Sequence, residues 1–123
     1  ALDFKRAGDF VFKADENLLR RVMDNLLSNA LKFTEKGGSV EVFYEKEEGK
    51  VRIRVSDTGR GVPPEKIHKI FEKYYQVEEK SSSKKGSGLG LAISKAIIEA
   101  HGGRIWAQPR KGQGTDFYIE IPA

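Results

Sequence analysis

The sequence predicts an α+β fold: a two-layer sandwich in which about three helices pack on one face of a mixed, mainly antiparallel sheet of about five strands. Three observations lead to this prediction. Segments with alternating apolar residues occur mostly in adjacent pairs, two longer segments have helical periodicity, and the helical segments stand between strand pairs. Strands that alternate one by one with helices would instead indicate a doubly wound parallel sheet.

The first long helix is expected over residues 15–34. Asp15 precedes it, and an aspartate side chain can cap a helix N-terminus. Apolar side chains then recur about every 3.6 residues, which gives the helix one buried face. These apolar residues are Leu19, Val22, Met23, Leu26, Ala30 and Phe33. The glycine pair at 37–38 is expected to end the segment.

Two further helices and the strands complete the order of elements. A short helix is predicted over 64–71 after paired prolines, and a second long helix over 89–100, which a glycine pair ends. Alternation with a period of two predicts strands at 40–45, 50–56, 104–108 and 116–121. Two shorter alternating runs around a Gly-Asp turn signal, 2–5 and 10–13, are further strand candidates. Residues 76–88 lose their apolar side chains and are rich in serine, lysine and glutamate, so we expect a mobile loop there.

Length and composition limit the class of protein. A chain of 123 residues forms one domain with a single core, so we expect residues 1–123 to be one unit. It has no cysteine, no export signal and no apolar run of the about 20 residues that a membrane span needs. We therefore expect a soluble, cytoplasmic piece without direct membrane contact of its own, either free or as the cytoplasmic part of a membrane-anchored protein. The net charge of +4 is mild and the basic residues alternate with acidic ones, so no nucleic-acid partner is expected.

Asn25, Asn29 and Lys32 form the first candidate site. Their spacing places them on one stripe of the first long helix, beside its apolar face. Asparagine is unfavourable inside a helix because its amide competes for backbone hydrogen bonds, so two in register indicate a ligand. Amide oxygens suit a hard cation such as Mg²⁺, and a lysine suits phosphate. A polar helix flank held by side-chain hydrogen bonds is the alternative explanation.

Asp57 opens the second candidate site, the sequence Asp-Thr-Gly-Arg-Gly at the end of a strand. A carboxylate in this place can accept a hydrogen bond from an amine such as that of adenine. Gly59 and Gly61 would let the loop approach a flat ring closely. An ordinary turn after a strand is the alternative.

Gly86, Gly88 and Gly90 form the third candidate site, just before the second long helix. Their spacing is not that of a dinucleotide-binding motif, and the sequence lacks the Gly-Lys-Ser/Thr of a P-loop. The main-chain N–H groups at such a helix N-terminus suit a phosphate. A flexible polar linker is the alternative.

Taken in order, these segments resemble the conserved boxes of bacterial sensor histidine kinases. Residues 25–33 are similar to the N box, 57–61 to the first glycine box, 70–75 to the F box, 86–93 to the second glycine box and 112–115 to the third. The resemblance runs from about residue 15 to residue 122. It implies the Bergerat α/β sandwich shared with type II topoisomerases, MutL and a class of heat-shock chaperones, with Mg·ATP as the ligand and residues 76–88 as a mobile ATP lid.

The resemblance also implies a role for each matching residue. Asn29 would bind the magnesium, Asn25 would support the phosphate and the metal shell, and Lys32 would contact phosphate. Asp57 would accept a hydrogen bond from the adenine amine. The other implied nucleotide-binding residues are Phe33, Gly59, Gly61, Ile70, Tyr75, Gly86, Ser87, Gly88, Leu89, Gly90, Leu91 and Thr115.

The implied activity is that of an ATP-dependent protein-histidine kinase. Its catalytic domain donates the γ-phosphoryl group to a histidine on a separate dimerising helical hairpin of the same protein and works with a response regulator in two-component signal transduction. An anti-sigma-factor-like serine kinase, or another nucleotide-binding regulator of this fold, is the alternative. Since dimerisation in this family belongs to the hairpin, we expect the isolated domain to be a monomer.

Two departures from the family pattern affect these expectations. Gln76 stands where the family often has an arginine that reaches the γ-phosphate, so that charge would come from a lysine at 73, 80, 84 or 85, or be missing. Neither His68 nor His101 has the sequence context of a phosphoacceptor, so both are expected to be structural or surface residues. Water-splitting relatives carry a general-base glutamate at the position of Asn25, and an amide cannot take a proton from water. We therefore expect no catalytic base in the chain and slow ATP hydrolysis.

Overall fold

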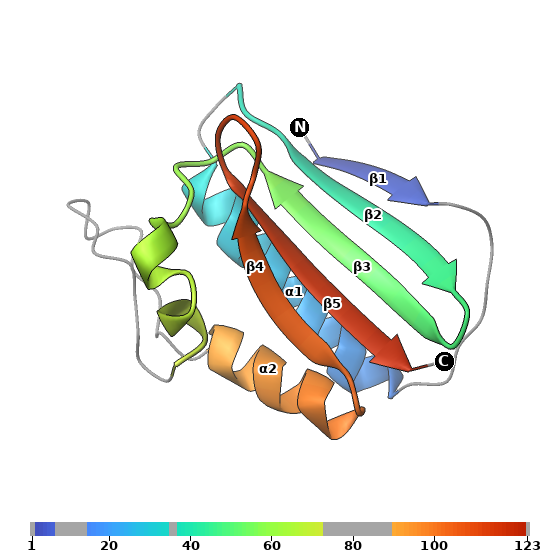
Figure 1. Cartoon of the computed structure of the whole chain (residues 1–123). Helices are drawn as coiled ribbons and strands as arrows, with labels where there is room; N and C mark the ends of the chain where they lie inside the picture. Colours follow the sequence, from blue (N-terminus) through green and yellow to red (C-terminus); the bar gives the residue numbers. More distant parts are fainter. Residues whose placement is uncertain (1, 7–14, 35–36, 73–89, 123) are drawn as a thin grey trace.

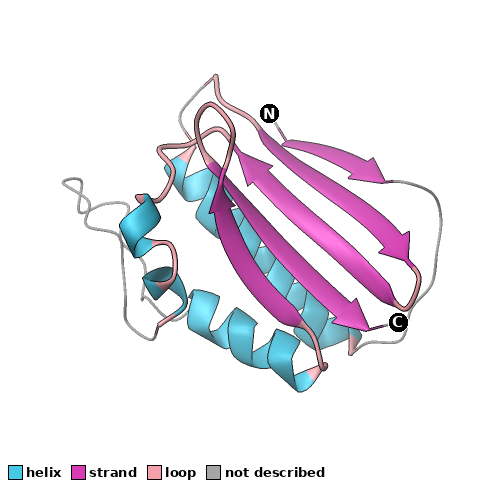
Figure 2. Cartoon of the chain, in the orientation of Figure 1, coloured by secondary structure: helices cyan, strands magenta, loops and turns pink. Residues whose placement is uncertain are grey.

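The computed structural model describes residues 2–6, 15–34, 37–72 and 90–122, and it confirms the predicted α+β sandwich (Figure 1, Figure 2). The described residues form one sheet of five strands: β1 (Leu2–Arg6), β2 (Val40–Glu47), β3 (Lys50–Asp57), β4 (Arg104–Pro109) and β5 (Thr115–Pro122). Their spatial order is β1-β2-β3-β5-β4, with β1 parallel to β2 and the other neighbours antiparallel. Two helices, α1 (Glu16–Phe33) and α2 (Gly90–Ala100), pack on one face.

The helix α1 forms where the periodicity predicts it. Asp15 caps its N-terminus, because Asp15 Oδ1 accepts a hydrogen bond from the Leu18 N–H at 3.0 Å. At the other end Thr34 is extended, and its hydroxyl donates to the Ala30 carbonyl at 2.7 Å. The helix therefore ends before the glycine pair at 37–38. Neither described helix is both long and apolar enough to cross a membrane.

The core lies between the two helices and the sheet. In β3 and β5 every second residue is a buried apolar one, and the antiparallel register places these residues opposite one another. Full burial of one such side chain stabilises the fold by about 1.5–3 kcal/mol. The side chains that α1, β3 and β5 contribute are Val22, Leu26, Ala30, Val51, Ile53, Val55, Phe117, Ile119 and Ile121.

The predicted helix over 64–71 was wrong, because the segment forms two short 3₁₀ turns instead. These are η1 (Pro64–Lys66) and η2 (Lys69–Phe71). In η2 the Glu72 N–H donates to the Lys69 carbonyl at 3.0 Å, and Glu72 is already extended. A segment of eight residues is too short for an α-helix to be stable by itself, so packing against the core decides its shape. The predicted strand 10–13 lies outside the described residues.

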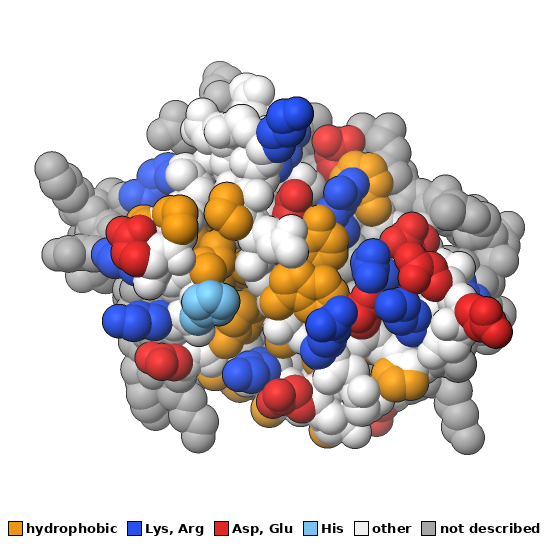
Figure 3. All heavy atoms as spheres, viewed as in Figure 1, with side chains coloured by type: hydrophobic (Ala, Val, Ile, Leu, Met, Phe, Trp, Pro, Cys, Tyr) orange, Lys and Arg blue, Asp and Glu red, His pale blue; other side chains and the backbone are white. Residues whose placement is uncertain are grey.

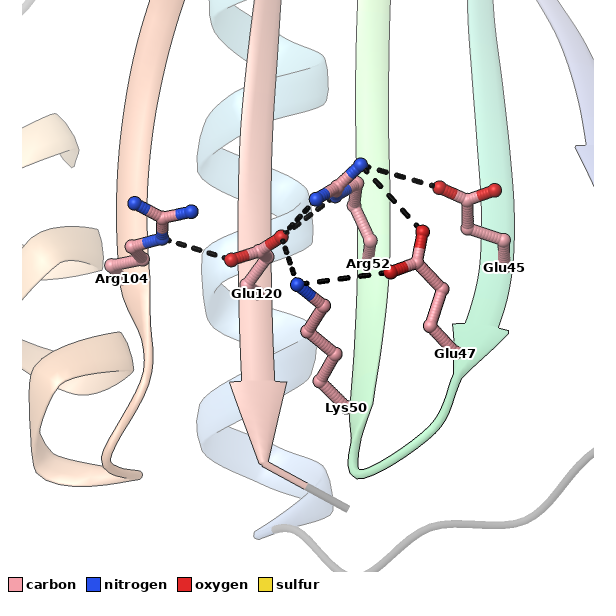
Figure 4. Close-up of polar contacts among 6 residues, drawn as sticks. All are labelled: Glu45, Glu47, Lys50, Arg52, Arg104 and Glu120. Carbon is pink, nitrogen blue, oxygen red and sulfur yellow. Dashed lines mark hydrogen bonds and ion pairs between the residues drawn. The ribbon is translucent and has the colours of Figure 1, made fainter.

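The opposite face of the sheet carries a network of charged residues around Glu120 (Figure 4). Glu120 is only 6% exposed, accepts hydrogen bonds at 2.8 Å from the Nε atoms of Arg52 and Arg104, and pairs with Lys50 Nζ at 3.4 Å. Burial alone would raise the pKa of Glu120, but the hydrogen bonds from its three partners outweigh it and lower the pKa to about 2. On this face, acidic and basic side chains lie next to one another with hydrophobic side chains between them (Figure 3).

Replacing Glu120 with glutamine is expected to lower the free energy of unfolding by about 1–3 kcal/mol at pH 7, because its cationic partners lose their shared counter-charge. The folded-state pKa lies below the ordinary value of 4.5, so this stabilisation is complete above that pH and is lost as the pH falls toward 2. Urea unfolding between pH 7 and pH 2 measures both effects. The difference in free energy of unfolding between the wild type and the variant should become smaller as the pH falls.

The control for this prediction is Glu47→Gln. Glu47 pairs with Lys50 at 3.7 Å and with Arg52 at 3.8 Å, but its side chain is 45% exposed. An exposed ion pair contributes only about 0–1 kcal/mol, so this variant should lose little stability. Equal losses in the two variants would contradict the assigned role of Glu120.

Candidate functional site

The predicted site residues that the structure describes lie at one end of the sandwich. Figure 1 shows the C-terminal half of α1, the end of β3, the turns η1 and η2 and the start of α2 around this end of the sheet. Thr58, the residue after β3, is held to Ser39. Its N–H donates to the Ser39 carbonyl at 3.1 Å, and its hydroxyl accepts from the Ser39 N–H at 2.9 Å. These bonds hold the loop after Asp57 against the segment that follows α1.

Asn25 contacts the start of α2. Its side-chain nitrogen Nδ2 donates to the Gly90 carbonyl at 3.1 Å and to the Ser94 hydroxyl at 3.2 Å. A carbonyl oxygen can only accept a hydrogen bond, so the amide nitrogen must face Gly90 and the amide oxygen Oδ1 must face elsewhere. A Cβ atom on Gly90 would lie 3.6 Å from this oxygen. The structure thus brings together two residues from separate predicted motifs, Asn25 and Gly90.

Asn29 lies one helical turn after Asn25 and is half-buried. Within the described part of the chain its side chain has no hydrogen-bond partner. Lys32, also half-buried, follows on the same stripe. A polar group at the edge of a core is costly unless water or a ligand satisfies it.

The donor set fits a magnesium ion bound together with phosphate. Asn25 Oδ1 and the Asn29 amide offer two neutral oxygens, and Mg²⁺ takes few protein ligands because it keeps several of its waters. Groups of three or more His, Cys, Asp or Glu residues that could form a dedicated metal site do not occur among the described residues. A metal at this end of the sandwich would therefore depend on the phosphates of its ligand.

Asp57 is the last residue of β3 and is 5% exposed. Its Oδ1 accepts a hydrogen bond from the Gly59 N–H at 2.9 Å. Burial raises the pKa of the Asp57 carboxyl, and hydrogen bonds from the N–H groups of Gly59 and Thr115 offset only part of this effect. The charge of Asp116 raises the pKa further and that of Arg110 lowers it, and the pKa stays above its ordinary value. Beyond these two N–H groups, the carboxylate still has lone pairs that can accept a hydrogen bond from a ligand.

Gly61 and Gly114 pack main chain against main chain beside Asp57. Both have positive φ angles, 77° and 109°. A Cβ on Gly114 would lie 1.8 Å from the Asp57 carbonyl oxygen, and one on Gly61 would lie 3.1 Å from the Gly114 carbonyl oxygen. Thr115 is 2% exposed and pairs with Asp57 in the sheet. The Gly-Gln-Gly-Thr turn therefore supports the loop that carries Asp57.

Apolar side chains form the wall at this end. Ile70 is 5% exposed, and Leu91 packs against the same core. Phe71 meets Phe117 edge-on, with 6.3 Å between the ring centroids. The side chain of Phe33 lies outside the described part of the structure, as do the lid, the lysines at 73, 80, 84 and 85, and Tyr75, Gly86, Ser87, Gly88 and Leu89.

Ser94 and Arg110 hold the site together, although neither was predicted from the sequence as a site residue. Ser94 is fully buried, and its hydroxyl donates to the Gly90 carbonyl at 2.9 Å. The sequence contained one signal that could have identified Ser94, because it is a polar residue on the apolar face of a helix. Arg110 donates from Nε to the Ser56 hydroxyl at 3.1 Å and from Nη1 to the Gln113 carbonyl at 3.1 Å. Since Ser56 is 54 positions away, no local signal could reveal this contact.

His101 has a structural role. Its Nε2 accepts a hydrogen bond from the Asp15 N–H at 3.1 Å, and its Nδ1 lies 2.9 Å from the Ile97 carbonyl. The ring therefore links the end of α2 to the N-cap of α1, with the proton on Nδ1. His68 is exposed next to η2.

Comparison with known protein families gives a match over residues 14–123, to the family described as histidine kinase-, DNA gyrase B-, and HSP90-like ATPase. In alignments 112 residues long that cover 88% of the chain, the chain is 44% identical to the sensor protein kinase WalK of Staphylococcus saprophyticus and 43% identical to WalK of Staphylococcus aureus. It spans only 18% and 27% of the lengths of these two relatives.

Solved structures give the same picture. The catalytic domain of histidine kinase ThkA matches 98% of this chain with a TM-score of 0.87 and 34% identity, over 78% of its own chain. The mycobacterial sensor histidine kinase MprB matches with a TM-score of 0.84 and 31% identity, over 98% of this chain and 81% of its own. ShkA, solved in complex with AMPPNP, has a TM-score of 0.85 and 36% identity, over 98% and 25% of the two chains. The chain therefore belongs to the histidine kinase-, DNA gyrase B- and HSP90-like ATPase family, as a catalytic domain of the sensor histidine kinase type.

Proposed function

We propose that the chain, as one domain, binds Mg·ATP and donates the γ-phosphoryl group to a histidine on a separate helical hairpin of its parent protein, in two-component signal transduction. The observation that carries this proposal is that the C-terminal half of α1 lies at the same end of the sheet as the end of β3 (Figure 1). This half of α1 carries two half-buried amides, Asn25 and Asn29, and β3 ends with the buried carboxylate of Asp57. The complex of its structural relative ShkA with AMPPNP supports an adenine nucleotide as the ligand.

In this proposal Asp57 recognises the base. Its Oδ1 accepts from Gly59, which leaves carboxylate lone pairs for the exocyclic amine of adenine. A charge-assisted hydrogen bond in a buried position is strong and selective for a donor. Ile70 and Tyr75 would line the base and the ribose, Phe33 would lie against the nucleotide, and Leu91 would anchor the far end of the lid. Gly59 would let the loop approach the ring, whereas the space beside Gly61 is taken by the main chain of Gly114.

The helix α1 would bind the phosphate end of the nucleotide. Asn29 would hold the magnesium, Asn25 would support it through Oδ1, and Lys32 would contact phosphate. Bound Mg²⁺ supplies neutralisation of the triphosphate charge. The main chain of Gly86, Gly88 and Gly90, near Ser87 and Leu89, would donate N–H groups to the phosphates. At the end of the site that would bind the base, Thr115 of β5 pairs with Asp57 and so supports it.

The chemistry then rests on position. Asn25 cannot take a proton from water, so water is a poor nucleophile in this site. An imidazole nitrogen from the hairpin attacks the γ-phosphorus, the bond to the bridging oxygen of ADP breaks, and ADP leaves. Phosphoryl transfer needs little covalent help from the protein, which agrees with a site built from amides and a lysine.

The partners proposed for the domain are the hairpin and a response regulator. The relative ThkA has been solved in complex with the response regulator TrrA, which supports the second of these partners. We propose that the domain works in the cytoplasm, where ATP is supplied, and that it is a monomer when separated from the hairpin.

Mixing the chain with the hairpin domain of its parent protein and [γ-³²P]ATP·Mg²⁺ is expected to label the hairpin on histidine, as an acid-labile and base-stable phosphate. Phosphate release by the chain alone should be much slower than this transfer, because Asn25 cannot act as a base. The matched control is a hairpin whose acceptor histidine is replaced by glutamine, which should take no label. Rapid ATP hydrolysis by the chain without transfer would contradict the proposal and favour an ATPase.

A further inference from the structure

We propose that Ser94 is a positioning residue for the phosphate end of the nucleotide. Together with the Gly90 carbonyl it fixes the Asn25 amide with its nitrogen toward α2 and its oxygen free for the magnesium and phosphate. This role rests on the function proposed above. Ser94 belongs to none of the residues predicted to bind the ligand, and it acts only through Asn25.

Three hydrogen bonds join Asn25, Gly90 and Ser94 in a closed triangle. Asn25 Nδ2 donates to the Gly90 carbonyl at 3.1 Å and to Ser94 Oγ at 3.2 Å, and Ser94 Oγ donates to the same carbonyl at 2.9 Å. A serine hydroxyl has one proton, and this one is directed to Gly90. The atom that Ser94 presents to Asn25 is therefore an acceptor lone pair, which only the amide nitrogen can satisfy.

The triangle determines which way the amide points. A flipped Asn25 would place Oδ1 against the Gly90 carbonyl oxygen, an unfavourable contact between two acceptors. The Ser94 hydroxyl could turn to meet the flipped oxygen, but only by giving up its bond to Gly90. Because Ser94 is fully buried, water cannot replace the lost bonds. The present orientation of the amide is thus strongly preferred.

A serine at this position is hard to explain by packing. Ser94 lies on the core face of α2 with Ile97 and Ile98, where alanine would have a higher helix propensity and no polar group to bury. A hydroxyl that bonds back to the carbonyl four residues earlier slightly destabilises a helix. Orientation of the Asn25 amide gives the hydroxyl a function that alanine could not supply.

The test is the affinity of the Ser94→Ala chain for two ligands, measured by calorimetry. Mg·AMPPNP, which reaches both ends of the site, is expected to bind about five- to tenfold more weakly, as loss of one hydrogen bond of about 1 kcal/mol implies. AMP without metal, held through its base at Asp57, should bind within about twofold of the wild type. Ser28→Ala, an exposed serine on the outer side of α1, is the matched control and should change neither affinity.

A double-mutant cycle separates positioning from general damage. In an Asn25→Ala background, Ser94→Ala should cost no further affinity for Mg·AMPPNP, since there is no amide left to orient. In the nucleotide-free protein, the chemical shifts of the Asn25 side-chain amide should differ from those of the wild type in Ser94→Ala and should be unchanged in Ser28→Ala.

The possible outcomes are distinguishable. Equal weakening of AMP and Mg·AMPPNP, additive losses in the double mutant, or unchanged binding by Ser94→Ala would each overturn the positioning role alone. Failure of the wild-type chain to bind Mg·AMPPNP would overturn the proposed function, and this role with it.

Discussion

Replacing Asp57 with asparagine is expected to weaken adenine-nucleotide binding by about 10- to 100-fold, which corresponds to the loss of one charge-assisted hydrogen bond of about 1.5–3 kcal/mol. The asparagine side chain has nearly the same size, and its oxygen can still accept the Gly59 N–H that Asp57 now accepts at 2.9 Å. The loop should therefore keep its shape. What disappears is the negative charge that would face the adenine amine in the proposed complex.

The same substitution is expected to leave the nucleotide-free chain as stable as the wild type or more stable at pH 7. Burial raises the pKa of Asp57 in the folded chain, so the folded state binds its proton more tightly than the unfolded state does. Stability then falls as the pH rises through the window between the two pKa values, and above it the charged carboxylate opposes folding. Asparagine removes this cost. The sign is opposite to that for Glu120, whose pKa is lowered.

The measurements are calorimetric titration with an ATP analogue and urea unfolding, both at pH 7. Asp116→Asn is the matched control, because Asp116 is a neighbouring carboxylate whose charge raises the pKa of Asp57. Removing that charge lowers the pKa of Asp57 and so favours the ionised carboxylate, and nucleotide binding should stay within about twofold of the wild type. A large loss of stability in Asp57→Asn, or equal losses of affinity in the two variants, would show that Asp57 is a structural residue.

The parts of the fold that follow from local patterns could be predicted from the sequence. The period of α1 is set by residues three and four positions apart, and Asp15 sits next to the N–H groups that it caps, so the pattern and its cause lie in one short segment. The hairpin between β2 and β3 was also predictable from the sequence, since Gly49 supplies the positive φ of 78° that its turn needs. The 3₁₀ turns at Pro64–Lys66 and Lys69–Phe71 were not, because packing and not propensity selects their shape.

The site was only partly predictable for the same reason. The sequence identified Asn25 and Asp57 as residues whose chemistry asks for a ligand. It could not show that Asn25 meets Ser94, 69 positions away, or that burial of Asp57 depends on the turn before β5. These contacts arise from sheet register and from the packing of α1 on α2. Short motifs contain no information about either.

The turn before β5 provides the second large effect: Gly114→Ala is expected to lower the free energy of unfolding by about 3–5 kcal/mol. A Cβ at Gly114 would lie 1.8 Å from the carbonyl oxygen of Asp57 and 2.7 Å from its carbonyl carbon. Both are main-chain atoms and cannot rotate away as a flexible side chain could. Relief would require the ends of β3 and β5 to separate where Asp57 pairs with Thr115.

Gly112→Ala is the matched control for backbone strain. Gly112 has a φ of 94°, close to the 109° of Gly114, but a Cβ on Gly112 would meet no atom within 4 Å. Its substitution should cost only the conformational strain of about 1–2 kcal/mol. Urea unfolding of the two variants therefore separates the strain that they share from the contact that only Gly114 makes. Similar losses would contradict the close approach of the turn to Asp57.

Gly103→Ala tests whether the effect on nucleotide binding depends on where in the sheet the chain is destabilised. A Cβ on Gly103 would lie 2.0 Å from the Glu120 carbonyl oxygen, near the opposite end of β5 from Gly114. Both variants should be destabilised, but only Gly114→Ala moves the main chain that carries Asp57. A Mg·ATP analogue raises the free energy of unfolding with the logarithm of its concentration divided by its Kd for the folded state, so it should raise the melting temperature of Gly103→Ala as it does that of the wild type. The Gly114→Ala variant should show a much smaller rise, because its substitution also displaces Asp57, the residue proposed to recognise the base.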